Sequence, residues 1–257
     1  MKRTLTLLAI LAAIGPAWGA EVVSSNIVGY NKIDLGKGFN LVGSQFVNVG
    51  ATDKTINDLV ASNELMPMTP EFAFQTKLQV WDGQKYLTYG WCDAASAAVM
   101  EMSAWSDKWL EEDFSAVATT PVPAGTGFWI ESSDEASLTI AGEVPENDTT
   151  EIAVSGGFTL LAYPYPETVS IQKIQSDDLA GMTPDFAFQS KLQVWDGSKY
   201  ITYGWCDADD GTAMSMPSWN STWLHEDYTE TTAADDIAIG AGFWIDTPSS
   251  ATIRFTK

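Results

Sequence analysis

Short runs of alternating apolar and polar residues dominate the chain, and they predict strands rather than helices. The segment LQVW at 78–81 is followed by Asp-Gly and then by YLTYGW at 86–91. This predicts two strands joined by a tight turn, since Asp-Gly readily adopts the positive φ of hairpin turns. The runs FNLVGSQF, GFWIES and SLTIAG are similar. Helix signals are weak, and the best candidates are TDKTINDLVAS from Thr52 and VSIQKIQSDDLA from Val169.

The pattern occurs twice. The segment MTPEFAFQTKLQVWDGQKYLTYGWCD from Met68 recurs almost unchanged from Met182, which indicates an internal duplication. Apart from Trp18, the tryptophans form equivalent pairs: Trp81/Trp195, Trp91/Trp205, Trp105/Trp219, Trp109/Trp223 and Trp129/Trp244. We therefore expect two tandem, homologous small β-barrel or β-sandwich domains, at 21–145 and 150–257, each with at most one or two short helices. The polar segment VPENDTTE is the predicted linker.

The beginning of the chain predicts export. Lys2 and Arg3 precede an apolar run that ends at Gly15-Pro16 and small residues, which is typical of a secretory signal peptide. We assign this peptide to residues 1–19, although cleavage after Ala20 also fits. No later segment has the ~20 apolar residues of a membrane-spanning helix. A protein secreted to the cell surface or the extracellular space is expected.

The negative net charge of the chain limits the classes of partner that it is expected to bind. The formal net charge is −21, with 34 acidic and 13 basic residues. Such a chain is repelled by phosphate backbones and anionic lipids, so nucleic acid is not an expected partner.

The abundant aromatic residues have two interpretations. Flat rings can stack on the apolar faces of sugar rings, or they can fill the core of a small domain. Because two tryptophan pairs lie in polar segments, they are our candidates for ligand binding. These candidates are Trp105, Trp109, Trp219 and Trp223.

Cys92 and Cys206 occupy equivalent positions in the two repeats. In an exported protein a disulfide between them is possible, provided that both Cα atoms lie within about 7 Å. Buried free thiols and an interchain bond are the alternatives, and the sequence does not choose among them.

Acidic residues suggest two further sites. Asp207, Asp209 and Asp210 have the oxygen density of a calcium loop, although the full spaced pattern is missing, so calcium is a possible cofactor. A glycosidase would have to use Glu112/Asp113 or Glu226/Asp227, but adjacent side chains of an extended segment point apart. The single histidine, His225, provides neither a repeated triad nor a zinc site. We expect no catalytic residues.

The segment NIVGYNKI from Asn26 extends the first repeat only. It can add an edge strand to its own domain, or it can pair with an exposed edge of another copy. Ile27, Val28 and Tyr30 are the candidate assembly residues.

The pattern GFNLVG, VWDG, PAGTGFWI and LTIAG resembles a β-rich module of exported bacterial proteins, and the two-unit form with SSNIVGY resembles secreted proteins of Verrucomicrobia and related bacteria. The resemblance covers nearly all of the chain after the signal peptide. It implies a surface or extracellular role, often alongside adhesins and envelope proteins, and it brings no catalytic residue. The MTPEFAFQ insertion and the cysteines depart from this pattern.

The expected function is therefore a non-enzymatic, structural or adhesive protein, acting at the cell surface or in the extracellular matrix and associating with itself as a homo-oligomer or filament. A tandem carbohydrate-binding module that recognises an extracellular glycan is the first alternative. A glycosidase is the second.

Overall fold

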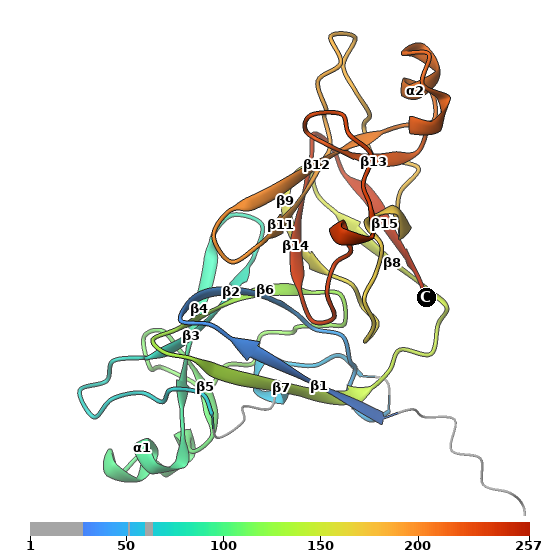
Figure 1. Cartoon of the computed structure of the whole chain (residues 1–257). Helices are drawn as coiled ribbons and strands as arrows, with labels where there is room; N and C mark the ends of the chain where they lie inside the picture. The colour runs from blue at the N-terminus through green and yellow to red at the C-terminus, as the bar shows by residue number, and fades with distance from the viewer. Residues whose placement is uncertain (1–27, 51, 60–63) are drawn as a thin grey trace, which may run out of the picture.

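Antiparallel strands form both halves of the computed structural model, which describes residues 28–50, 52–59 and 64–257 (Figure 1). The protein is mainly β, as the sequence predicts, and none of the sheets formed by the described residues closes into a barrel. Each half has a sandwich-like arrangement of one five-stranded sheet and one smaller sheet. Within the described residues, no helix is both long and apolar enough to cross a membrane.

The first half contains a five-stranded sheet in the order β2-β6-β3-β4-β5 and a two-stranded sheet of β1 and β7. The strands of the larger sheet are β2 (Gly38–Gly43), β6 (Gly127–Ser132), β3 (Thr76–Trp81), β4 (Tyr86–Cys92) and β5 (Lys108–Glu111). The smaller sheet pairs β1 (Val28–Leu35) with β7 (Ala136–Glu143). Asp82 begins the predicted turn between β3 and β4, and Gly83 has a φ of 99°.

The second half repeats this topology and adds one short strand, β10, to its smaller sheet. Its larger sheet has the order β13-β12-β11-β14-β9, and its smaller sheet has the order β10-β15-β8. The strands are β8 (Thr149–Val154), β9 (Gly157–Ala162), β10 (Ile174–Gln175), β11 (Lys191–Trp195), β12 (Tyr200–Cys206), β13 (Thr222–His225), β14 (Gly242–Thr247) and β15 (Ala251–Thr256). The strand β8 begins inside the segment expected to be the linker.

The helices differ from the prediction. In their described residues, the two predicted segments form single 3-10 turns, η1 (Ile56–Asp58) and η3 (Ile171–Lys173). Each turn ends at once because its C-cap residue is already extended. The α-helices are instead α1 (Ala94–Val99) and α2 (Asp210–Ala213), which lie at opposite ends of the molecule in Figure 1. The remaining 3-10 turns are η2 (Ser103–Trp105), η4 (Pro217–Trp219) and η5 (Ala233–Asp235).

Each half has its own core, and a tryptophan lies at its centre. Alternation along β4 sends Tyr89 and Trp91 inward, and Trp91 contacts the fully buried Trp109 at a ring distance of 5.5 Å. Asn57 holds Trp109 in place: its Oδ1 accepts from the Trp109 backbone N–H at 2.9 Å, and its Nδ2 donates to the Trp109 carbonyl at 3.3 Å.

Gln172 holds Trp223 in the same way in the second half. Its Oε1 accepts from the Trp223 backbone N–H at 3.1 Å, and its Nε2 donates to the Trp223 carbonyl at 2.7 Å. In each half, a side-chain amide on a 3-10 turn therefore bonds the backbone N–H and C=O groups of the buried tryptophan on the edge strand.

The halves meet with approximate twofold symmetry. The Gly43 N–H donates to the Gly240 carbonyl at 2.8 Å, and the equivalent Ala162 N–H donates to the Gly125 carbonyl at 2.8 Å. A Cβ on Gly43 would lie 2.2 Å from the Cβ of Ala162. The close approach of the two edge strands, β2 and β9, therefore requires glycine at this position.

Candidate functional site: an aromatic groove between the halves

The apolar contact between the halves is built mainly from tryptophan. Trp81 contacts Trp244 edge to face at a ring distance of 5.8 Å, and Trp129 contacts Trp195 in the same manner at 5.7 Å. These pairs are equivalent under the internal symmetry. Leu41 and Leu160 complete the cluster. Since these side chains project from the outer faces of the two five-stranded sheets, the duplication itself creates this contact.

Aromatic rings continue from this cluster to the surface. Phe39 lies against Trp129 at 6.0 Å, and its equivalent Phe158 lies against Trp244 at 5.9 Å. Phe39 is 51% exposed. Tyr86 and Tyr200, each 39% exposed, lie against Trp81 and Trp195. The result is a continuous aromatic strip that crosses both halves.

One side of the strip is hollowed. This aromatic groove has a volume of about 360 Å³. It is lined by Phe39, Gln79, Tyr86, Trp129, Trp195 and Tyr200. Because both halves contribute residues, neither half alone forms it. Its size is at the lower end of the range for small-molecule sites, about 300–1,000 Å³.

The polar groups of the groove can orient a ligand. The Trp244 indole N–H donates to the Tyr200 hydroxyl oxygen at 3.2 Å, and the Trp129 indole bonds to the Tyr86 hydroxyl in the same way. Burial raises the pKa of Tyr86, so its phenol stays protonated at neutral pH. Its O–H remains a donor while its oxygen accepts the indole N–H. The amide of Gln79 forms no hydrogen bond among the described residues and can donate or accept.

The two sides of the strip are not identical. The Trp81 indole N–H donates to the Phe158 carbonyl at 2.9 Å. The equivalent indole N–H of Trp195 is buried without a partner in the described part of the chain. Trp195 therefore lacks the hydrogen bond to the opposite half that Trp81 makes, and this difference lies beside Phe39, on the side of the groove.

A more polar hollow adjoins the groove at Tyr86. It has a volume of about 530 Å³ and is lined by Lys85, Tyr86, Leu87, Thr88, Glu111, Glu112, Asp113 and Ser115. Tyr86 therefore lies between an aromatic surface and a surface rich in hydrogen-bonding groups.

The predicted ligand-binding residues lie elsewhere. Trp109 and Trp223 are fully buried, so the interpretation of these two residues as a binding surface is wrong. They are buried because each faces a core tryptophan of the neighbouring strand. Trp105 and Trp219 are half-buried, and each stacks on an aromatic neighbour of its own half, Phe114 or Tyr228. Their role in binding stays a prediction.

The cysteines are free. Cys92 and Cys206 are both fully buried, and each lies in a separate apolar cluster beside the helix of its own half. The intrachain disulfide is therefore not formed, and buried thiols, one of the three alternatives, describe this structure. Burial, with acidic neighbours, raises the pKa of Cys92 to about 11 and that of Cys206 to about 12.

The suggested calcium residues shape a loop. Asp210 Oδ2 accepts the backbone N–H groups of Met182 and Asp207 at 2.7 and 2.9 Å. Asp207 Oδ1 accepts those of Asp209 and Asp210 at 2.9 and 3.1 Å. No group of three or more His, Cys, Asp or Glu suited to a metal occurs among residues 28–50, 52–59 and 64–257. The first repeat uses Asp93 similarly, as the N-cap of α1.

The acidic pairs considered for glycoside hydrolysis belong to turns. Asp113 accepts from the Ser115 backbone N–H at 3.0 Å, and Asp227 accepts from the Thr229 N–H and hydroxyl at 3.1 and 2.6 Å. Hydrogen bonds from the Ser115 and Thr229 side chains, followed by those from their backbone N–H groups, lower the pKa of Asp113 and Asp227. A general acid needs the opposite shift.

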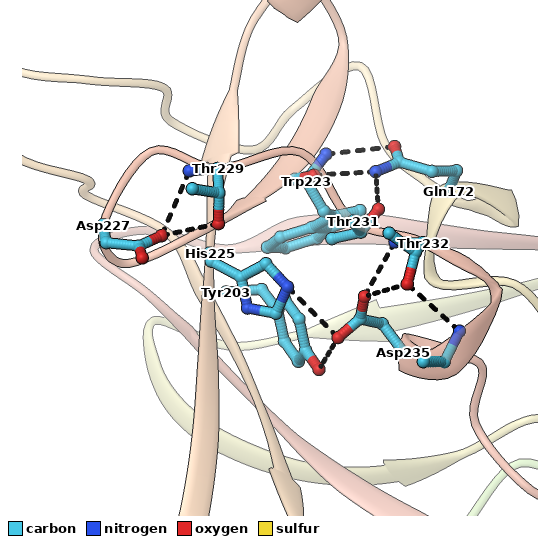
Figure 2. A network of polar contacts seen from close by, with 10 residues as sticks. Gln172, Tyr203, Trp223, His225, Asp227, Thr229, Thr231, Thr232 and Asp235 are labelled. Carbon is cyan, nitrogen blue, oxygen red and sulfur yellow. Dashed lines mark hydrogen bonds and ion pairs between the residues drawn. The ribbon is translucent and has the colours of Figure 1, made fainter.

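His225 belongs to a polar network that is specific to the second half (Figure 2). Asp235 Oδ1 lies 3.1 Å from His225 Nε2 and accepts the Tyr203 hydroxyl at 3.0 Å. Its Oδ2 accepts the Thr232 backbone N–H at 2.7 Å, which completes a capping box at η5. In the first half, the Tyr89 hydroxyl meets Thr120 instead. The network joins β12 and β13 to η5, which is a structural role.

Of the candidate assembly residues, Val28 and Tyr30 lie on β1, which pairs with β7 of its own half. Ile27 lies outside the described residues, as does the predicted signal peptide.

Sequence reasoning missed the groove. The available signal was the alternation in LQVW and GFWI, which places Trp81 and Trp129 opposite to the core residues of the same strands. No family model matches the chain, and neither a search of curated proteins nor a search of solved structures finds a match.

Proposed function

We propose that the protein is a non-enzymatic, exported adhesive protein that binds extracellular glycan in the aromatic groove. The observation that carries this proposal is the groove itself: exposed rings of Phe39 and Tyr86 lie beside the indoles of Trp129 and Trp195. Aromatic faces stack on the apolar faces of sugar rings, and the Gln79 amide and the tyrosine hydroxyls can bond to sugar hydroxyls.

The charge of the protein favours neutral or amino-bearing glycans. At −21, the chain repels sulfated and uronic polymers. The hollow next to Tyr86 contributes three acidic residues, Glu111, Glu112 and Asp113, and a single lysine. An extended neutral chain could place one ring in the groove and its hydroxyls along this polar surface.

Binding without catalysis agrees with the chemistry of the groove. Its lining consists of four kinds of side chain, those of Phe, Gln, Tyr and Trp, and includes no carboxylate, histidine or thiol. Glycoside hydrolysis commonly needs two carboxyl groups across the scissile bond. The proposal therefore makes adhesion, and not turnover, the activity.

A glycan array that includes neutral, amino-bearing and anionic glycans tests this function. Purified protein lacking residues 1–19 should bind neutral or amino-bearing glycans. Phe39→Ala and Tyr86→Ala should each weaken binding about fivefold or more, because stacked aromatic contacts contribute ~1 kcal/mol or more each. Phe186→Ala removes a ring that is 46% exposed but lies outside the groove, and it serves as the matched control.

Three results would contradict the proposal. They are the absence of glycan binding by the native protein, equal binding by the groove variants, and preferential binding of sulfated polymers. Isothermal titration with a soluble oligosaccharide from the array distinguishes a weaker groove from a lower yield of folded protein.

A further inference from the structure

The strand β1 has one free edge. It pairs with β7 along its whole length, from Val28 opposite Glu143 to Leu35 opposite Ala136. No other strand of the described chain pairs with it. An unpaired edge presents backbone donors and acceptors to any strand that approaches.

The backbone groups that face this edge follow from the ladder. Glu143 exchanges both of its backbone hydrogen bonds with Val47, at 3.0 and 2.9 Å, on the far side of β7. Its partner across the antiparallel pair, Val28, must then direct its own N–H and C=O away from β7. Every second residue does the same. Val28, Tyr30, Lys32 and Asp34 therefore offer their N–H and C=O groups at the free edge.

The first part of this edge is apolar, and its second part is charged, at Lys32 and Asp34. Val28 is 65% exposed and Tyr30 is 76% exposed. Edges are normally protected by charged residues. The equivalent edge in the second half, β8, follows that rule: Thr149 occupies the place of Tyr30, and Glu151 binds Arg254 at 3.3 Å. Both edges carry charge, at Lys32 and Asp34 of β1 and at Glu151 of β8, and they differ in the exposed apolar side chains of Val28 and Tyr30.

We propose that β1 pairs antiparallel with β1 of a second copy, in a register centred on Asn31. This register bonds all four outward residues of each strand, because Tyr30 lies opposite Lys32 of the second copy and Val28 lies opposite its Asp34. Lys32, whose ammonium forms an ion pair with Glu64 of its own chain at 2.9 Å, then lies opposite the tyrosine ring of the second copy. The arrangement is symmetric, so one surface serves both copies.

The dimer would present two aromatic grooves, which increases the avidity for a polymeric glycan. The pairing does not depend on glycan binding, and its failure would leave the proposed function untouched. A single strand edge forms a small interface, so the association should be weak and dependent on concentration.

Sedimentation velocity of protein lacking residues 1–19 tests the pairing. The native protein should form dimers as its concentration rises toward about 1 mM, the weak end of specific association. Tyr30→Pro removes the ring and an N–H that points to the free edge, so it should weaken dimerisation at least tenfold without breaking the β1–β7 ladder. Thr149→Pro, at the equivalent position of β8, should leave dimerisation unchanged.

Tyr30→Lys provides a second variant that keeps the backbone donor, and it should also weaken dimerisation. Native protein that stays monomeric at about 1 mM would overturn the proposal. So would dimers that persist in both Tyr30 variants.

Cross-linking tests the register. A mixture of Tyr30→Cys and Lys32→Cys proteins should form a disulfide-linked heterodimer, since residues opposite each other in a bonded pair have Cα atoms about 5.5 Å apart. Cys92 and Cys206 are buried and should not compete. Dimers that do not yield this heterodimer would overturn the register.

Discussion

Trp129 of the first half and Trp195 of the second half meet edge to face, with ring centroids 5.7 Å apart and an interplanar angle of 78°. Their equivalents, Trp244 and Trp81, repeat the contact at 5.8 Å and 79°. The same four indoles therefore join the halves and support the aromatic groove. Stability of the interface and formation of the site should be coupled, because they use the same side chains.

Trp244→Ala should uncouple the halves. Trp244 is 6% exposed, and removing a buried indole typically costs about 3–5 kcal/mol. Scanning calorimetry should show a lower midpoint, with unfolding split into two transitions where the native protein has one. Trp219→Ala, on a peripheral loop, is the control and should leave a single transition. A single, unshifted transition in Trp244→Ala would contradict this role of the interface.

Gly43→Ala tests the close approach of the halves. A methyl group there would lie 2.2 Å from the Cβ of Ala162, and the edge strands β2 and β9 must separate to admit it. We expect a loss of about 1–3 kcal/mol in the free energy of unfolding, measured by urea titration. The control is Gly36→Ala, where the nearest atom is 3.8 Å away. Equal stability of the two variants would show that the interface tolerates separation.

Much of the fold could be predicted from local patterns. The Asp-Gly turn after LQVW, the alternation in β4 and the repeat itself are set by residues within a few positions of one another or by direct comparison of two segments. The short helices were misplaced because capping residues also form single turns. Thr55 and Asp58 form a capping box, but the chain is extended again at Leu59.

The site was harder to predict because it depends on contacts between distant surfaces. Alternation shows that Trp81 points away from Leu78 and Val80, but it does not show what covers Trp81. The polar neighbours of Trp109 suggested exposure, yet β5 is a strand whose Trp109 faces Trp91. The amide of Asn57 that binds its backbone lies far away in the sequence. Such pairings require the tertiary fold.

Acid should weaken the network around Asp235. Burial opposes ionisation of this carboxyl, but hydrogen bonds from Thr232 and Tyr203 and the nearby His225 outweigh it, so its pKa is lowered. A carboxyl whose pKa is lowered by folding stabilises the protein at pH values above its pKa in the unfolded chain, about 3.9. This contribution is lost as the pH falls through the pKa of the folded state. Asp235→Asn should therefore be less stable than the native protein near pH 7, by about 1–2 kcal/mol.

The difference should begin to shrink below about pH 4, where the carboxyl of the unfolded chain becomes protonated, and it should be lost once the pH falls below the lowered pKa of Asp235 in the folded protein. Urea titrations at a series of pH values measure it. Asp236→Asn changes the next residue, whose side chain forms no hydrogen bond among the described residues, and is the matched control. A difference that stays constant from neutral to acid pH would show that the charge of Asp235 does not contribute.

The two thiols should be unreactive in the folded protein and reactive after unfolding. Burial, together with Asp93 and Asp107 near Cys92, and with Asp210 and Asp207 near Cys206, raises both pKa values well above the ordinary thiol value of about 8.5. At pH 8 the thiols stay protonated, and thiolate is the nucleophile. Ellman's reagent should therefore label the native protein very slowly. After denaturation without a reducing agent, it should label both cysteines. Denatured protein that needs prior reduction before it reacts would show instead that the cysteines are bonded, within or between chains.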